Sequence, residues 1–406
     1  MQHITGIKKY IYLLLKGLNR NILNLPLGFI LFMFKKMRYE KFTLHSDKVF
    51  INTIYTPIPS TSYDIALKNF VKLSKGILRP FSVYIALTDR CHLNCWYCSN
   101  ANKEIFGDLP LEDLLRIIKE IQDVGISCIG FTGGEPTLRS DLEELVANVD
   151  ERSFTILFTS GYSINKKRAN ALKKAGLTAI VISLDSHIKE EHKRIRGSEI
   201  AFDDAISAVK NSLKAGIYTA ISTVITKEML YTQKIYEFIH YVGRLGVLEI
   251  RILEPLPCGK LLNSDYEKFE EKDRIQLRKL QYKINKDKTL PKIMALAHIN
   301  SEDNYGCNAG RTHVYIGANG NIYPCDFSPL AFGNLLEEPF SKIYSRMNKF
   351  LFKPSSACII STIYDWIRKS NNIKLPIRDL KLTEQLLEPI KNNSTPMLFK
   401  KLGFKG

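Results

Sequence analysis

Between residues 81 and 262 the sequence alternates short apolar runs with longer segments whose apolar residues recur at helical spacing. The runs SVYIALT, SCIGFT, FTILFTS, AIVISLD, TAISTVIT and LEIRILEP predict strands, and their nearly continuous apolar character is typical of strands buried on both faces. The segments between them predict helices, three of which end at Gly125, Gly176 and Gly216. Such alternation implies a parallel sheet with right-handed crossovers. The sequence therefore predicts an α/β fold, a partial (β/α)6 TIM-like barrel.

Candidate functional residues follow the predicted strands. They are Cys91, the segment 133–136, Ser160, Asp185 and Glu254, each at or just past a strand end. In parallel sheets of this kind, chemistry gathers at the carboxyl ends of the strands. We therefore expect these side chains to share one end of the barrel.

Three cysteines, Cys91, Cys95 and Cys98, stand in a C-x3-C-x2-C pattern after the first strand. The chain has eight cysteines in 406 residues, too few for a disulfide scaffold, so the pattern indicates metal or cluster chemistry in a reducing compartment. Tetrahedral zinc usually takes four protein ligands, often as two C-x2-C pairs. Three thiolates suit a [4Fe–4S] cluster with one iron left open for another ligand.

This triplet, with the aromatic Tyr97 before its last cysteine, resembles the signature of the radical S-adenosylmethionine (SAM) enzymes. The resemblance extends over about residues 80 to 335 and includes the segments FTGGEP, ISLDS and HKRIRG. It implies a cluster whose open iron chelates SAM and whose electron cleaves SAM to a 5′-deoxyadenosyl radical that takes hydrogen from a substrate. The SAM contacts implied by the resemblance or by position at a strand end are Tyr97, Gly133, Gly134, Glu135, Pro136, Ser160, Ser183, Asp185 and Arg196.

A second cysteine set begins with Cys307 and Cys325, which flank a predicted hairpin with a turn at Gly320. The pattern C-x12-G-x4-C resembles the start of the SPASM/twitch extension, which binds auxiliary iron–sulfur clusters. The dense cysteine run of a full SPASM form is missing, and only Cys358 follows. We therefore expect one auxiliary [4Fe–4S] cluster, with Cys258 as a candidate fourth ligand or a thiol facing substrate. Structural zinc at these cysteines is the alternative.

Four regions are expected: a basic, partly amphipathic segment (1–80), the barrel (81–262), the cluster-binding extension (263–360) and a basic tail (361–406). The first has thirteen Lys or Arg and three Asp or Glu, whereas residues 339–406 have thirteen and four. Basic ends favour an anionic partner such as a membrane surface. The apolar runs near the N-terminus are too short to span a bilayer, so an interfacial position fits them better.

The sequence does not select a substrate. We expect a radical SAM enzyme that modifies a peptide or protein side chain, with a membrane lipid or isoprenoid, a tetrapyrrole or a sugar as alternatives. A reducing partner such as ferredoxin or flavodoxin is implied. The expected location is cytoplasmic, free or peripheral on the inner face of the cell membrane, and no nucleic-acid partner is expected. A zinc-stapled nucleic-acid-binding protein is the remote alternative, although its basic residues would then lie far from the cysteines.

Overall fold

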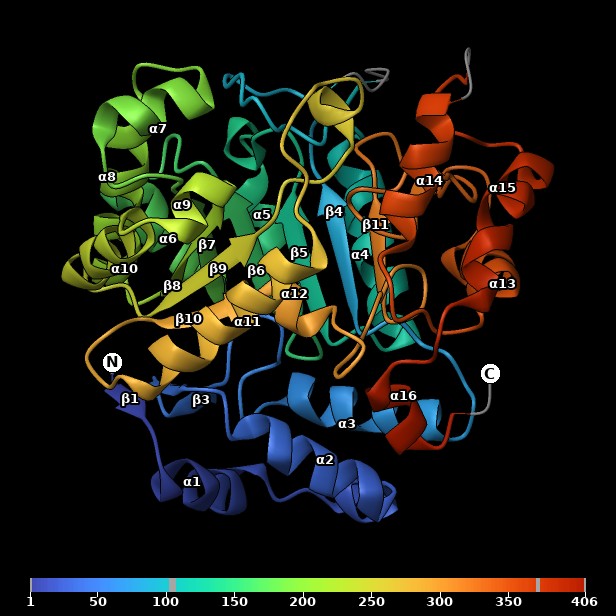
Figure 1. Ribbon diagram of the computed structural model, residues 1–406, viewed down its shortest axis with the longest axis horizontal. Coiled ribbons are helices and arrows are strands. Elements are labelled where there is room, and N and C mark those ends of the chain that lie inside the picture. The colour runs from blue at the N-terminus through green and yellow to red at the C-terminus, as the bar shows by residue number, and fades with distance from the viewer. Residues whose placement is uncertain (1, 102–106, 370–372, 405–406) are drawn as a thin grey trace.

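The computed structural model describes residues 2–101, 107–369 and 373–404. The six predicted strands form the centre of a larger sheet with the order β10-β9-β8-β7-β6-β5-β4-β11-β12. All neighbours from β4 to β9 are parallel, which confirms the predicted partial barrel (Figure 1). The central strands are β4 (Ser82–Ala86), β5 (Cys128–Thr132), β6 (Phe154–Thr159), β7 (Ala179–Ser183), β8 (Tyr218–Val224) and β9 (Glu249–Leu253).

Both edges of the sheet carry strands that the sequence analysis did not assign to it. On one edge β10 (Lys292–Ala295) pairs in parallel with β9. On the other edge β11 (His313–Ile316) pairs in parallel with β4, and β12 (Ile322–Tyr323) completes the predicted hairpin. The hairpin that separates two cysteines of the second set is therefore part of the barrel sheet.

The predicted helices cover the outer face of the sheet (Figure 1). In α4 the apolar residues Leu114, Ile117 and Ile121 are fully buried, and the helix ends at Gly125, whose φ of 97° suits a left-handed cap. The helices of the barrel are α4 (Leu111–Val124), α5 (Leu142–Ala147), α6 (Lys166–Lys174), α7 (Lys189–Arg196), α8 (Ala201–Lys214), α9 (Lys227–Tyr231) and α10 (Lys234–Arg244).

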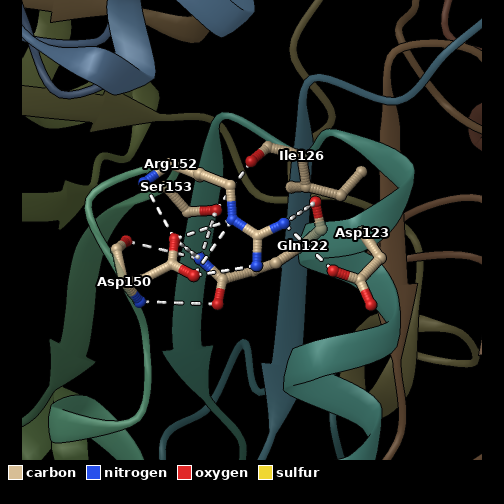
Figure 2. Close-up of polar contacts among 6 residues, drawn as sticks. All are labelled: Gln122, Asp123, Ile126, Asp150, Arg152 and Ser153. Carbon is tan, nitrogen blue, oxygen red and sulfur yellow. Dashed lines mark hydrogen bonds and ion pairs between the residues drawn. The ribbon is translucent and has the colours of Figure 1, made fainter.

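A polar network links the end of α4 to the turn before β6, at the amino end of the parallel strands (Figure 2). Arg152 donates to Asp150 at 2.8 Å and to Asp123 at 3.0 Å, and Gln122 donates to Asp150 at 3.0 Å. Ser153 donates to the carbonyl of Ile126 at 2.6 Å. These bonds therefore join two adjacent βα units.

The N-terminal segment lies beneath this end of the barrel (Figure 1). Asn69 of its third helix donates to the carbonyl of Gly125 at 2.9 Å, and the ring of Phe70 contacts that of Phe81. A small antiparallel sheet in this segment has the order β1-β2-β3. The elements of the N-terminal segment are β1 (Gln2–Ile4), α1 (Ile7–Gly17), η1 (Arg20–Asn24), α2 (Leu27–Met37), β2 (Phe42–His45), β3 (Lys48–Phe50) and α3 (Thr61–Ser74).

The C-terminal part packs along the open side of the barrel and returns to the N-terminal helices. In the last helix Leu398, Phe399 and Leu402 are buried in one apolar cluster with Leu25 and Phe29. Within the described residues, none of the helices combines the length and the apolar character needed to cross a bilayer. The elements after the barrel strands are η3 (Gly259–Leu261), α11 (Glu271–Lys286), α12 (Leu296–Ile299), α13 (Phe340–Leu351), α14 (Ile359–Lys369), α15 (Leu380–Leu387), η4 (Glu388–Asn392) and α16 (Met397–Leu402). The short η2 (Pro136–Leu138) belongs to the barrel, between β5 and α5.

Candidate active site

The cysteine loop follows β4 at the carboxyl end of the sheet, and the segment after β5 holds it. The N–H of Gly134 donates to the carbonyl of Thr88 at 2.7 Å, and that of Glu135 donates to Arg90 at 2.8 Å. A Cβ on Gly134 would lie 2.2 Å from the Arg90 carbonyl oxygen, so no side chain fits there. The close approach at Gly133 and Gly134 is to the backbone of residues 87–90, which lead into the cysteine loop.

Glu135 is buried beneath the loop and accepts from several donors. Thr159 donates to Oε1 at 2.6 Å, and the backbone N–H and hydroxyl of Ser160 donate to Oε2 at 2.7 and 2.6 Å. The N–H and hydroxyl of Thr137 also donate to Oε1. Pro136 is buried beside it and begins η2. Two predicted contacts, Glu135 and Ser160, are therefore brought together at the ends of β5 and β6.

A second group joins the loop to β7 and α7. Arg196 Nε lies 2.7 Å from Asp185 Oδ2, and the Tyr97 hydroxyl donates to the same oxygen at 2.8 Å. Arg196 also lies over the Tyr97 ring and donates to Cys95 Sγ at 3.6 Å. Burial raises the pKa of the Cys95 thiol, whereas the Arg196 charge lowers it. Ser183, the last residue of β7, is half-buried and lies in register with its neighbour on β8.

The backbone of the loop is also fixed from outside. The N–H of Asn94 donates to the Arg196 carbonyl at 2.9 Å, and the N–H of Lys260 donates to the Cys98 carbonyl at 3.0 Å. A Cβ on Gly259 would lie 2.1 Å from that Cys98 oxygen. Sequence reasoning missed this contact between the segment after β9 and the cysteine loop. The only signal for it was the glycine directly after Cys258.

The second cysteine set is drawn from four segments, those of Cys258, Cys307, Cys325 and Cys358. The thiols of Cys307 and Cys358 share a hydrogen bond, which lowers the pKa of Cys307. The N–H of Cys307 also donates to the Ser355 carbonyl at 2.8 Å. Burial raises the pKa of the Cys325 thiol, and the neighbouring Asp326, Cys307 and Cys258 raise it further. Within the described residues, neither cysteine set is arranged as a group of three or more side chains that could hold a metal ion.

Both cysteine sets suit iron–sulfur clusters, because thiolates are the ligands that such clusters take in proteins. The first set offers three thiols on one short loop, of which Cys91 is exposed and Cys95 is buried. The second set offers Cys307, Cys325 and Cys358 from separate segments, with Cys258 buried nearby. The thiol chemistry of both sets therefore fits the groups that the sequence pattern predicts.

A cavity of about 890 Å³ runs along the open side of the barrel beside the second cysteine set. Its polar end contains Glu254 and Arg274, whose Nε lies 3.0 Å from Glu254 Oε1. Burial raises the pKa of Glu254, and the Arg274 charge opposes this. Arg274 belongs to α11 and had not been singled out by the sequence analysis. Apolar residues along the rest of the cavity include Leu13, Leu18, Ile22, Phe29, Met33, Ile54, Phe70, Leu253, Leu256 and Ile299.

Two family profiles match the chain. The Radical SAM superfamily matches residues 85–239, and SPASM, an iron-sulfur cluster-binding domain, matches residues 307–359. The chain is therefore a radical SAM enzyme with a SPASM domain, which confirms the predicted family. Its cofactors are a [4Fe–4S] cluster, SAM and auxiliary iron–sulfur clusters bound by the SPASM domain.

Relatives within this class have different substrates. The AdoMet-dependent heme synthase of Methanosarcina barkeri is 24% identical over 65% of this chain and 82% of that protein. A probable GTP 3′,8-cyclase of Saccharolobus islandicus is 33% identical over 46% of this chain and 61% of that protein. SuiB of Streptococcus suis, bound to SAM, has a TM-score of 0.60 at 20% identity over 77% of this chain and 80% of its own. Another SuiB structure holds the precursor peptide SuiA. The likeness to SuiB establishes the fold.

Proposed function

We propose that the chain uses Cys91, Cys95 and Cys98 to hold the [4Fe–4S] cluster that cleaves SAM, and that its substrate lies in the cavity beside the second cysteine set. The bound cofactors supply a 5′-deoxyadenosyl radical that takes hydrogen from the substrate. The observation that carries the proposal is the fixing of one three-thiol loop by three separate segments, those of Glu135, Arg196 and Lys260.

The proposed role of the surrounding residues is to position SAM and to keep water from it. Gly133 to Pro136, Ser160, Ser183, Asp185, Arg196 and Tyr97 are the proposed SAM contacts. The Arg196 guanidinium is suited to a carboxylate because its N–H groups form a planar fork. Asp185 holds that fork in place through Nε. A ferredoxin or flavodoxin is the proposed source of the electron.

The proposed auxiliary site is one cluster held by Cys307, Cys325 and Cys358. Cys258 is the proposed fourth ligand, and its segment also contacts the cysteine loop through Gly259. Such a position, between the two cysteine sets, suits a residue that borders the space where substrate and SAM meet.

The cavity favours a lipid or isoprenoid chain as substrate. A peptide brings backbone N–H and C=O groups, which lose free energy when they are buried without hydrogen-bond partners. A hydrocarbon chain has no such groups and fits an apolar lining such as that of Leu18, Phe29 and Met33. At the other end of the cavity, the Glu254 carboxyl group and the Arg274 guanidinium would then face the polar headgroup of the lipid.

A peptide or protein side chain, the substrate class favoured by the sequence, is the second candidate. Its support is the SuiB structure, which binds a precursor peptide on a similar fold. Adding each candidate separately to the SAM-cleavage assay distinguishes the two classes. A long-chain isoprenoid should raise the turnover of SAM, whereas a soluble peptide mixture should not. The opposite result would favour the peptide candidate.

The experiment that tests the chemistry is a count of iron and sulfide with an assay of 5′-deoxyadenosine. The chain is purified and reconstituted without oxygen, then given SAM and dithionite. We expect about eight irons in the wild type and about four in a Cys91→Ala/Cys95→Ala/Cys98→Ala variant, with 5′-deoxyadenosine formed only by the wild type. A count of about four irons in the wild type that falls to none in the variant would show that there is no auxiliary cluster. Bound zinc without iron would overturn the proposal.

A further inference from the structure

An apolar surface covers the outer face of the N-terminal helices. We call the large exposed apolar residues of α1, η1, α2 and the link between α1 and η1 the N-terminal apolar face. Their exposed fractions run from 39% at Phe34 to 86% at Leu23. Single exposed leucines are ordinary on protein surfaces, but a contiguous group marks an interaction site. The face consists of Ile7, Ile11, Leu14, Leu15, Leu18, Leu23, Leu27, Leu31 and Phe34.

The spacing of these residues shows that the face is a property of the helices. In α1 they recur at intervals of three and four residues, and in α2 Leu27, Leu31 and Phe34 do the same. Each helix therefore presents one apolar stripe to the outside. The opposite stripes are buried, as Phe29 and Phe32 are in α2. The helices lie at the outer edge of the molecule, beyond α3 (Figure 1).

The charge of the same segment has one sign. Residues 1–39 contain seven Lys or Arg and no Asp or Glu. Lys8, Arg20, Lys35 and Arg38 are exposed in the segment that carries the apolar face. Apolar residues surrounded by cations are the pattern of helices that lie in the interface of an anionic membrane.

The cavity of the active site reaches this face. Leu14, Leu18 and Phe34 are exposed on the N-terminal apolar face and also line the cavity. From there the lining continues through Met33 and Tyr305 to Cys307. The cavity therefore joins the apolar face to the second cysteine set.

We propose that the N-terminal apolar face docks on an anionic membrane, and that a lipid hydrocarbon chain enters the cavity between α1 and α2. This inference rests on the proposed function for the fate of the chain, but the docking does not. A second copy of the protein is a poorer occupant. A symmetric contact would bring the exposed Lys8, Arg20, Lys35 and Arg38 of each copy together, with no carboxylate in residues 1–39 to offset them.

Vesicle sedimentation of the full reconstituted chain tests the docking. We expect about tenfold stronger binding to phosphatidylcholine vesicles that contain phosphatidylglycerol than to phosphatidylcholine alone, with loss at high salt. A Leu15→Ser/Leu23→Ser/Leu27→Ser variant should bind about tenfold less. These three leucines do not line the cavity. Ile200→Ser/Leu336→Ser, at exposed apolar residues far from the face in the sequence, is the matched control and should bind as the wild type does.

Two outcomes would overturn the docking proposal. One is equal sedimentation of the wild type and the triple variant. The other is a wild-type dimer that does not sediment with vesicles and that the triple variant converts to monomer, since the face would then be a contact between copies. Formation of 5′-deoxyadenosine without vesicles is measured in the same preparations. If the wild type forms 5′-deoxyadenosine but does not sediment with vesicles, the docking is overturned and the proposed chemistry stands.

Quenching by lipids with brominated acyl chains tests entry into the cavity. Leu27→Trp places an indole on the apolar face, and Met33→Trp places one in the cavity lining. We expect the added fluorescence of both variants to be quenched, and that of Leu336→Trp to stay unchanged. Quenching of Leu27→Trp alone would show docking without entry and would overturn the second half of the proposal.

Discussion

Gly259 lies against the carbonyl group of Cys98, so close that a Cβ would come within 2.1 Å of the oxygen. Its φ of 55° also favours glycine. The next residue, Lys260, donates its N–H to the same oxygen at 3.0 Å. The segment that carries Cys258 is therefore built onto the loop that carries the first three cysteines.

Gly259→Ala should displace the cysteine loop. We expect the iron content to fall from about eight toward about four per chain, because the first cluster loses the geometry of its ligands. Iron and sulfide analysis after reconstitution measures this. Gly28→Ala is the matched control, since a Cβ there meets nothing within 4 Å. An unchanged iron content in Gly259→Ala would show that the contact does not position the loop.

Asp185→Asn should destabilise the fold and loosen Arg196. The two side chains form a buried ion pair, and removal of one charge leaves the other uncompensated. We expect the free energy of unfolding to fall by about 3 kcal/mol, measured by urea titration. The control is Glu190→Gln on α7, the helix that carries Arg196, because its solvent-exposed pair with Lys193 should leave the free energy of unfolding close to that of the wild type. Equal effects of the two substitutions would contradict the prediction.

Glu249→Gln should be among the most destabilising single substitutions at the base of the barrel. Glu249 accepts from Thr53 at 2.6 Å and from the Tyr218 hydroxyl at 2.7 Å, and it lies 3.4 Å from Lys292 Nζ. Without the carboxylate, the buried Lys292 ammonium has lost its anionic partner. We expect a loss of about 3–5 kcal/mol in the free energy of unfolding.

A double variant separates the lost pair from the buried charge that remains. Glu249→Gln/Lys292→Met removes both charges and should recover most of the lost stability. Chemical denaturation of the four proteins of the cycle gives the coupling energy. A double variant as unstable as Glu249→Gln would show that the hydrogen bonds from Thr53 and Tyr218 dominate.

Acid should destabilise the protein through His192. Burial lowers the pKa of this imidazole to about 4 from its usual 6.5, and its Nδ1 accepts the N–H of Asp185. Between these values the unfolded chain binds a proton that the folded chain does not. Stability therefore falls as the pH drops from 6.5 to 4, by up to about 3 kcal/mol from this residue.

Thermal or urea unfolding at several pH values measures that slope. His192→Gln should flatten the profile, although the variant starts from a lower stability at pH 7 because the ring is buried. His240→Gln, at an exposed position of α10, should leave the profile unchanged. The same slope in His192→Gln as in the wild type would assign the acid sensitivity to other groups.

The repeated βα units could be predicted because each is coded locally. β5 is a short apolar run, and α4 combines apolar residues at helical spacing with a glycine stop at Gly125. The three cysteines of the first loop could be recognised for the same reason, since all lie within eight residues. Local patterns of this kind do not depend on the rest of the fold.

The edges of the sheet were not predictable in this way. β10 has four residues after a lysine-rich helix, and β11 was recognised only as half of a hairpin. What makes each a barrel strand is its parallel pairing with β9 or β4, residues far away in the sequence. Pairing over such distances depends on the completed sheet, because a short strand has little preference of its own.

The sequence by itself determined the class of chemistry, because soft thiolate ligands at a fixed short spacing leave few alternatives to a cluster. Only the tertiary structure decided how the parts are joined. It brought Gly259 onto Cys98, Arg196 onto Asp185, and Cys358 within hydrogen-bond reach of Cys307. It also carried one cavity from Cys307 to the exposed leucines of α1. Contacts between distant segments arise from packing, and packing is a property of the whole chain.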